Sequence, residues 1–396
     1  MTALQITHFT ATSCLGRGLE ATLAALEASR SGLKPCHFET VAIETQIGEV
    51  AGLDAVQLPA PLRDFECRNN RLAQLGLEQD GFDSAVRDSA ARWGRQRLGV
   101  FLGTSTSGIL ETEIAYRARD PGSGALPAGF DYEHRHNSFS VSDYVRRALE
   151  LEGPAVSLCS ACSSSAKAFA AAQRMIGAGL IDAAVVGGVD SLCLTTLYGF
   201  HSLQLMARTA CRPFDLRRDG LSIGEAAAFA LLERASGQED AKVLLLGAGE
   251  SSDAHHMSSP HPDGAGARAA MRRALDAAGL EPRDVDYINL HGTGTPSNDS
   301  AESVAVSALF GTEAPCSSTK AATGHTLGAA GALEAVICAL ALHHDLLPGG
   351  LNLTERDPQL KLNYLTENRR GTLNTVLSNS FGFGGVNCAL LFGRAA

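Results

Sequence analysis

Short, almost wholly apolar runs alternate along this chain with alanine-rich stretches of helical length. A strand with apolar side chains at successive positions has both faces buried, so such runs predict a sheet covered by helices on each side. The runs are residues 99–102, 183–186, 243–246 and 376–379. Helices are predicted over residues 163–179 and 333–343. The pattern therefore indicates an α/β protein.

The order of strands and helices is similar on the two sides of the polar stretch 236–240. A chain of 396 residues, of which 45% are apolar and 19% charged, can bury two cores or one large duplicated core. We therefore predict two related halves, residues 1–240 and 241–396, whose buried sheets are stacked between helices. Residues 111–150 are richer in charges and loop signals, and they are predicted to form an insertion at a subunit interface.

The bulk composition argues against several functions and compartments. The chain has 33 basic and 43 acidic residues, a net charge of −10, which disfavours nucleic acid as the main partner. The N-terminal residues lack the basic and apolar regions of a secretory signal, so a cytoplasmic protein is expected. The apolar stretch 329–342 is interrupted by Glu334 and is too short to span a membrane, which predicts a buried core helix.

Three segments that lie far apart in the chain share one design, a reactive side chain beside small residues. Cys162 follows the strand-like run 155–158, His291 enters a Gly-Thr-Gly-Thr turn, and Lys320 and His325 border a short Ala/Gly-rich segment. Together they predict covalent thiol chemistry at one shared cleft. Because Cys162 precedes a predicted helix, whose N-terminus stabilises a thiolate, its pKa is expected to fall.

Each of these residues also has a plainer interpretation. Most cytosolic cysteines are small buried hydrophobes, and the other cysteines of this chain are assigned to the core. Cys159 and Cys162 form a Cys-x-x-Cys pair, but the sequence has no second pair to complete a zinc site. A redox pair would need a thioredoxin-like setting, which is missing. Cys159 is therefore also assigned to the core, and no metal is predicted.

The motifs resemble the β-ketoacyl-acyl-carrier-protein synthases, which are elongating condensing enzymes of the thiolase superfamily. The resemblance covers essentially the whole chain. It includes Arg212-Pro213-Phe214-Asp215, Ser252-Asp253-Ala254, residues 291–296, Lys320 with Gly324-His325, and residues 379–385. It implies a thiolase-like fold with five αβαβα layers. It also implies decarboxylative Claisen condensation of an enzyme-bound acyl group with malonyl-acyl-carrier protein, which gives 3-oxoacyl-acyl-carrier protein.

The resemblance implies roles for individual residues. Cys162 would accept the acyl group, and His291 and His325 would hydrogen-bond the malonyl thioester carbonyl and stabilise the enolate. Lys320 and Glu334 would support the charge balance of the site. No organic cofactor is implied beyond the phosphopantetheine of the carrier.

Further residues are implied to contact the substrate. Phe383 would gate the acyl pocket, and its backbone N–H would form an oxyanion hole with that of Cys162. Contacts to the substrate or its pantetheine arm are implied for Thr293, Thr295, Asn387 and Thr106. Related enzymes often place an apolar side chain near Thr106, so a threonine indicates an acyl pocket of different polarity or depth. Either primary fatty-acid elongation or a specialised polyketide or polyene pathway fits this pattern.

The partners implied are an acyl carrier protein and a second subunit, which could be identical or a related ketosynthase-like chain. Carrier proteins are typically acidic, so a local basic patch is expected on this acidic chain. The candidate docking residues are Arg63, Arg68, Arg71, Arg208 and Arg212.

Two other functions compete with condensation. A biosynthetic thiolase needs a second cysteine in the C-terminal glycine loop, whereas here Cys388 comes after that loop. A non-catalytic chain-length-factor subunit generally lacks the nucleophile, whereas this chain has Cys162, His291 and His325. Both comparisons favour a catalytic, decarboxylative synthase.

Overall fold

The computed structural model describes residues 3–234 and 243–395, and most of its strands form one large sheet. The order is β14-β12-β11-β16-β17-β10-β1-β9-β7-β5-β6, with β2 paired to β1. The strands of the N-terminal half are β1 (Leu4–Ser13), β2 (Gly16–Arg17), β5 (Leu98–Gly103), β6 (Ala155–Leu158), β7 (Ala183–Asp190) and β9 (Ala226–Glu233). Those of the C-terminal half are β10 (Val243–Ser252), β11 (Tyr287–Asn289), β12 (Pro315–Ser317), β14 (Asn363–Tyr364), β16 (Thr375–Gly382) and β17 (Val386–Arg394). All four apolar runs predicted as strands are confirmed.

The two halves meet where β1 pairs with β10. Leu4, Gln5 and Ile6 pair with residues 243–245 of β10, and this short antiparallel ladder makes the two half-sheets continuous. Two small sheets lie outside the large one. Their strands are β3 (Lys34–Pro35), β4 (Gln46–Gly48) and β8 (Ile223–Gly224) in one, and β13 (Leu346–Leu347) and β15 (Arg369–Arg370) in the other.

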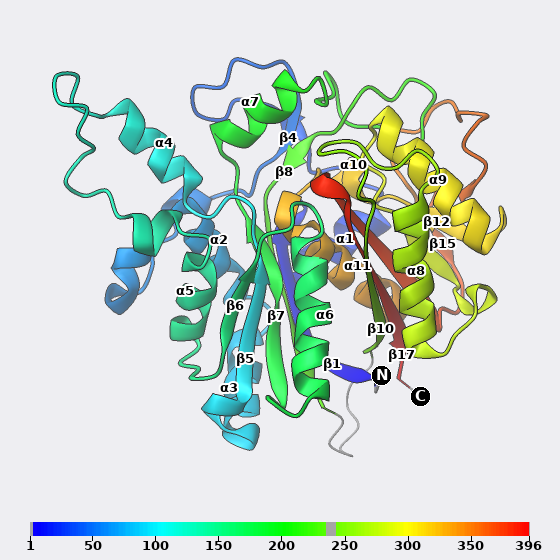
Figure 1. The fold of residues 1–396 in the computed structure, drawn as a ribbon, viewed down its shortest axis with the longest axis horizontal. Helices are drawn as coiled ribbons and strands as arrows, with labels where there is room; N and C mark the ends of the chain where they lie inside the picture. The colour runs from blue at the N-terminus through cyan, green and yellow to red at the C-terminus, as the bar shows by residue number, and fades with distance from the viewer. Residues whose placement is uncertain (1–2, 235–242, 396) are drawn as a thin grey trace.

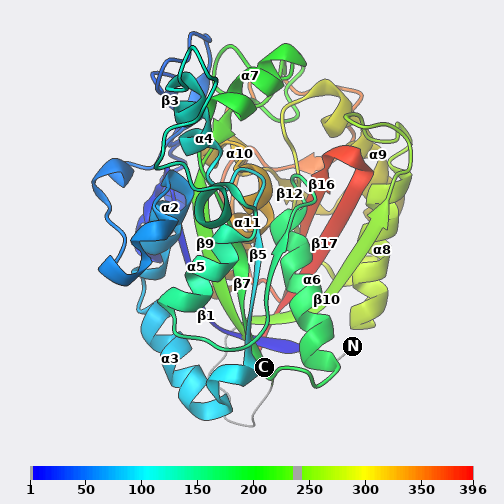
Figure 2. The same cartoon turned by 60° about the vertical axis from the view of Figure 1, so that its left-hand side comes forward.

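Helices cover both half-sheets and fill the space between them (Figures 1 and 2). The outer layer on the N-terminal half contains α2 (Arg68–Leu77), α3 (Phe82–Trp93) and α5 (Ser140–Ala148). The central layer contains α6 (Ser164–Gly177) and α11 (Ala330–His344), with α1 (Gly18–Glu27) beside them. The outer layer on the C-terminal half contains α8 (Ala265–Ala278) and α9 (Pro296–Phe310). The five-layer, thiolase-like arrangement is confirmed.

The position of β9 between two helical layers explains why its residues 226–232 are all apolar. Ala228 and Ala230 pack in the central core against α11, whereas Phe229 and Leu231 pack in the outer core against α2 and Phe82 of α3. Successive side chains of a strand point to opposite faces, so a strand between two helical layers is buried on both.

Helix α11 is buried around its whole circumference, and Glu334 is the one charged residue among its residues 330–342. Every residue from Ala330 to Leu342 is buried, as expected for a helix enclosed on all sides. The segment Leu327–His344 is long and apolar enough to cross a membrane by length and composition, but 89% of it is buried within the protein. The prediction of a buried core helix is therefore confirmed.

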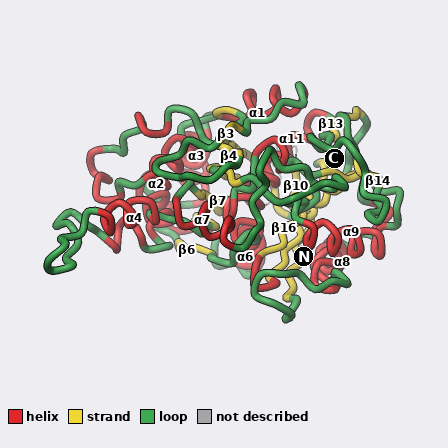
Figure 3. The backbone as a smooth tube through the Cα atoms, turned by 90° about the horizontal axis from the view of Figure 1, so that it is seen from above, coloured by secondary structure: helices red, strands yellow, loops and turns green. Residues whose placement is uncertain are grey.

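The predicted insertion over residues 111–150 is wrong for its C-terminal part. Helix α4 (Ile109–Arg117) and the loop after it project from one end of the molecule (Figures 1 and 3). The chain then returns through a π-helical turn, Tyr132–His136. Helix α5 belongs to the layered core instead, because its Val141, Tyr144 and Val145 are fully buried. We call residues 109–137 the arm. The stretch 236–240, where the boundary between the halves is predicted, lies outside the described residues.

Candidate active site

Cys162 lies in a tight turn between β6 and α6, two residues before the helix begins. Ala161 has a φ of +51°, a left-handed conformation that costs energy for any residue with a side chain. The Oγ of Ser164 holds this turn, because it donates to the Ala161 carbonyl at 2.6 Å and accepts from the Ser160 N–H at 2.9 Å. The helix N-terminus therefore presents the thiol of Cys162 in a fixed position.

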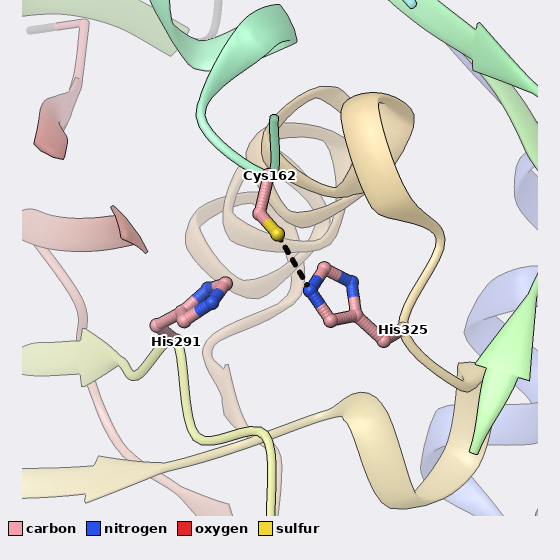
Figure 4. Close-up of side chains that lie close together, drawn as sticks. All are labelled: Cys162, His291 and His325. Atoms are coloured by element: carbon pink, nitrogen blue, oxygen red, sulfur yellow. Dashed lines mark hydrogen bonds between the residues drawn. The ribbon is translucent and has the colours of Figure 1, made fainter. Parts of the chain in front are cut away.

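His325 and His291 come from different segments and lie beside this thiol (Figure 4). The Nε2 of His325 is 3.1 Å from the Sγ of Cys162. The two imidazole rings are 5.3 Å apart between centroids and nearly perpendicular. The backbone of His325 is bonded on both sides, to Ser222 and Gly224. The structure thus brings all three side chains together across the two halves of the chain.

Hydrogen bonds to Nδ1 fix the tautomer of both histidines. The backbone N–H of Leu327 donates to Nδ1 of His325 at 3.1 Å, and the Nζ of Lys320 lies 3.3 Å from Nδ1 of His291. Each ring therefore carries its proton on Nε2, the nitrogen that faces the cleft. Burial lowers the pKa of both histidines well below the usual value, and the positive charge of Lys320 lowers it further. Both rings are neutral hydrogen-bond donors at neutral pH.

Lys320 is buried behind His291 and is paired with Glu334. Its Nζ donates to the His291 carbonyl at 2.6 Å and forms a short ion pair with Glu334 of α11. Lys320 lies on the four-residue helix α10 (Lys320–Thr323). Burial raises the pKa of Glu334 to about 7, and Lys320 opposes this rise. The pair places a positive charge beside the histidines without exposing it to solvent.

The expectation of a lowered thiol pKa is wrong. Burial raises the pKa of Cys162 to about 11, and it outweighs the charge of Lys320 and the backbone N–H groups of Phe383 and Cys162, which lower it. The N-terminus of α6 lowers the thiol pKa only through its nearest groups. Burial by all the surrounding layers removes water from the sulfur and therefore raises the pKa more strongly. The resting nucleophile is therefore a thiol, and the thiolate is a minor species at neutral pH.

The rate of alkylation of Cys162 should consequently keep increasing with pH above the pH at which an ordinary cysteine is fully ionised. With a pKa near 11, the rate of reaction with iodoacetamide should rise roughly tenfold per pH unit between pH 7 and 10, because only the thiolate reacts. Fragment-ion mass spectrometry, which locates the label within a peptide, would separate Cys162 from the exposed Cys159. A rate that levels off below pH 8 would contradict the raised pKa.

A cleft leads to the cluster. Cys162, His291 and His325 line it, together with Thr293, Thr295, Asn387 and Phe383 among the predicted substrate contacts. The hydroxyls of Thr293 and Thr295 are 2.9 Å apart, so they present paired polar groups on one wall. The side chain of Asn387 is held by Asp253 at 2.7 Å. This polar lining suits an extended chain with amide groups.

Phe383 lies in a short turn over the cleft. Its ring is half-buried and packs against Phe200, with 5.4 Å between centroids. Gly384 follows with a φ of +80°, and a Cβ there would meet no atom within 4 Å. The turn is therefore loosely packed on its outer side.

The predictions for Thr106, as a substrate contact, and for Cys159, as a core residue, are both wrong. Thr106 does not line the cleft, because its hydroxyl donates to the buried Asp190 at 2.8 Å and accepts from the Ser191 N–H at 3.1 Å. Cys159 is not in the core but exposed, since it follows β6 at the edge of the sheet.

The predicted docking arginines differ in exposure. Arg68 is wrong as a docking residue, because it is only 3% exposed and its guanidinium is bonded to Glu225 and Asp54. Arg71 is half-buried and paired with Glu66. Arg63 and Arg208 are exposed, and Arg212 is half-buried.

Glu302 is a site residue that the sequence analysis missed. Its carboxylate accepts hydrogen bonds from the backbone N–H groups of His291 and Gly292, each at 2.8 Å. It lies on α9, eleven residues after His291, and it fixes the turn that carries this histidine. A glutamate eleven residues after His291 was the only signal available in the sequence.

The three central side chains also have the spacing of a metal site. Their ligand atoms lie within 4.8 Å of one another, and a thiol with two imidazoles is a zinc-type ligand set. However, the ammonium of Lys320, in contact with His291, would repel a divalent cation. The arrangement therefore fits nucleophile chemistry better than metal binding.

Family models cover most of the chain. Residues 71–238 match the N-terminal domain of β-ketoacyl synthases, and residues 243–354 match the C-terminal domain.

Individual relatives agree with these matches. The chain is 33% identical over 417 aligned positions to 3-oxoacyl-[acyl-carrier-protein] synthase 2 of Coxiella burnetii, and the match covers 98% of both proteins. It is similar to the ketosynthase ApeO in complex with its chain length factor ApeC from Xenorhabdus doucetiae, with a TM-score of 0.90, 38% identity and coverage of 99% and 98%. It is also similar to the ishigamide ketosynthase/chain length factor, with a TM-score of 0.90, 27% identity and coverage of 100% and 99%.

Proposed function

The chain belongs to the β-ketoacyl synthase family, and we propose that Cys162, His291 and His325 are the residues with which it performs the family's reaction. It is an acyltransferase that forms a carbon–carbon bond and produces 3-oxoacyl-acyl-carrier protein. The observation that carries the proposal is the 3.1 Å contact between the thiol of Cys162 and the Nε2 of His325, inside a cleft that His291 also lines.

In the first step, the thiolate of Cys162 attacks the carbonyl carbon of an acyl-carrier thioester. A bond forms between the sulfur of Cys162 and the acyl carbon, and the bond from that carbon to the carrier sulfur breaks. The carrier leaves as a thiol, with the proton that the thiol of Cys162 has lost. The backbone N–H groups of Cys162 and Phe383 both lower the pKa of the sulfur. They are suitably placed to stabilise the oxyanion that forms next to it.

In the second step, malonyl-carrier enters the cleft and loses carbon dioxide. The electron pair of the broken bond moves into an enolate, whose oxygen accepts hydrogen bonds from the Nε2–H groups of His291 and His325. The enolate carbon then attacks the acyl carbonyl on Cys162, and the sulfur–carbon bond breaks. Neutral donors suit this step, because they stabilise the enolate oxygen without protonating the carbon that must react.

Incubation of the protein with acyl-carrier and then malonyl-carrier tests this function. Intact-mass spectrometry should show an acyl group on Cys162 that disappears when malonyl-carrier is added, together with a carrier product longer by two carbons. A protein that is never acylated would support the alternative, a non-catalytic chain-length-factor subunit.

We further propose that the chain acts in a specialised pathway and pairs with a ketosynthase-like subunit. The two related structures described above are both assemblies of a ketosynthase with a chain length factor. Strand β6 is an edge of the sheet, and its Val156 is 38% exposed. Such an edge offers unpaired backbone groups to a second chain. Tyr132 in the arm and Phe139, two residues after the arm ends, add further exposed apolar surface.

Arg208 is the strongest candidate for contact with the acidic carrier protein. It is exposed and lies three residues after Leu205, which lines the cleft. The variant Arg208→Glu should raise the KM for malonyl-carrier about 5- to 20-fold at low salt with little change in kcat, because steering by charge acts before chemistry. The effect should shrink as salt is added.

A matched charge reversal separates local contact from net charge. Arg87 is an exposed arginine of α3, on another part of the protein. If Arg87→Glu raises KM as much as Arg208→Glu does, the carrier does not dock at Arg208.

A further inference from the structure

Asp190 is a fully buried carboxylate at the end of β7 that joins two separate segments of the site. It does not line the cleft, so it has no contact with substrate. A buried carboxylate is costly unless hydrogen bonds satisfy it. Every bond that Asp190 accepts comes from one of two loops, and one of those loops carries His325.

The first loop follows β5. Oδ1 of Asp190 accepts from the hydroxyl of Thr104 at 2.8 Å and from the backbone N–H of Ser105 at 2.7 Å. It also accepts from both the N–H and the hydroxyl of Thr106, each at 2.8 Å. The carboxylate thereby fixes this loop as a rigid wall.

The second loop is the turn directly after His325. Oδ2 of Asp190 accepts from the backbone N–H of Gly328 at 2.5 Å. A Cβ at Gly328 would lie 2.7 Å from the same oxygen, so only glycine allows this approach. Leu327 has a φ of +53°, and its N–H is the donor to Nδ1 of His325. The strained residue that sets the tautomer of His325 is therefore next to the residue that Asp190 holds.

We propose that Asp190 is a positioning residue for the condensation, which acts through Gly328 and Leu327 to keep the Nε2–H of His325 directed at the reacting atoms. The proposal rests on the role proposed for His325 above. Without the carboxylate, the turn 327–329 is free to relax from its strained conformation. The Leu327 N–H then moves away from Nδ1, and the His325 ring is free to rotate or to change tautomer.

The variant Asp190→Asn tests this directly, because it keeps the size of the side chain but presents N–H groups to the donors. The kcat for release of carbon dioxide from malonyl-carrier should fall about 10- to 100-fold with an unchanged KM, as small misplacements of a catalytic group typically cause. In ¹⁵N-histidine spectra, His325 should lose its pure Nε2–H tautomer while His291 keeps it. An unchanged tautomer and kcat would overturn the proposal.

A second variant disturbs the same contact from the other side, in case Asp190→Asn does not fold. Gly328→Ala places a methyl group against Oδ2 of Asp190 and should produce the same change at His325. Gly177→Ala, at the end of α6, is the matched control, because a Cβ there meets nothing within 4 Å. Equal effects of both alanines on His325 would contradict the proposed contact.

The same experiments distinguish this proposal from the proposed function. If the wild-type protein releases no carbon dioxide from malonyl-carrier, the proposed function fails. The tautomer of His325 still reports whether Asp190 positions it.

Discussion

Replacement of Cys162 by alanine should abolish acylation of the protein and lower the rate of condensation at least about 1,000-fold, because no other group in the cleft can form the thioester intermediate. The cleft lining otherwise offers hydroxyls, two amides, the carboxylate of Asp253 and the two imidazoles, and none of these groups can form a thioester. Intact-mass spectrometry after incubation with acyl-carrier measures the first effect, and product analysis measures the second. Release of carbon dioxide from malonyl-carrier should continue, since it needs the histidines and not the thiol.

The Cys162→Ser variant is the matched control, because it keeps the shape of the side chain and changes only its reactivity. A hydroxyl occupies nearly the same space, but it ionises far less readily than a thiol, so acylation should remain very slow. If Cys162→Ala were acylated as fast as the wild type, another nucleophile would be acting. Cys159 would then be the first residue to examine, because it is exposed and only three positions away.

Removal of either histidine should have the second-largest effect. His291→Ala and His325→Ala should each lower the rate of malonyl decarboxylation about 100- to 1,000-fold, the usual loss when one donor to a developing oxyanion is removed. His325→Ala should also slow acylation of Cys162, because its Nε2 lies 3.1 Å from the sulfur. His291→Ala should affect acylation less, since it has no such contact in the described structure.

The double variant shows whether the two rings act as a unit. If both donate to the same oxygen, their effects should be far from additive. A fully additive result would indicate that they act in different steps. Substitution by asparagine, which retains an N–H donor, should restore part of the activity that alanine removes.

The sequence alone allows prediction of those parts of the site that depend on local pattern. Cys162, His291 and His325 each follow a short run of residues with a clear strand or turn signal, and their motifs resemble one family. The apolar runs predict the strands because burial on both faces leaves an unmistakable composition. The five layers follow from the resemblance, and the alternation of strands and helices agrees with it.

What could not be predicted depends on residues that are distant in sequence. Arg68 lies in a short segment with Arg63 and Arg71, which suggests a basic surface, but Glu225, 157 positions away, holds it inside the protein. The thiol pKa of Cys162 is set by burial from several layers, whereas only the effect of the adjacent helix is visible locally. Thr106 likewise appears free in the sequence, although Asp190 occupies its hydroxyl.

The two-sided burial of β9 also determines how its alignment with neighbouring strands is protected. In most sheets a one-residue shift in register is prevented because it would move apolar side chains to the solvent face and polar side chains to the core. Strand β9 lacks this contrast, since both of its faces are buried. Size takes its place, because a slip would drive Phe229 and Leu231 into the space shaped for Ala228 and Ala230 and leave voids on the opposite side. Bulk, not polarity, keeps this strand in place.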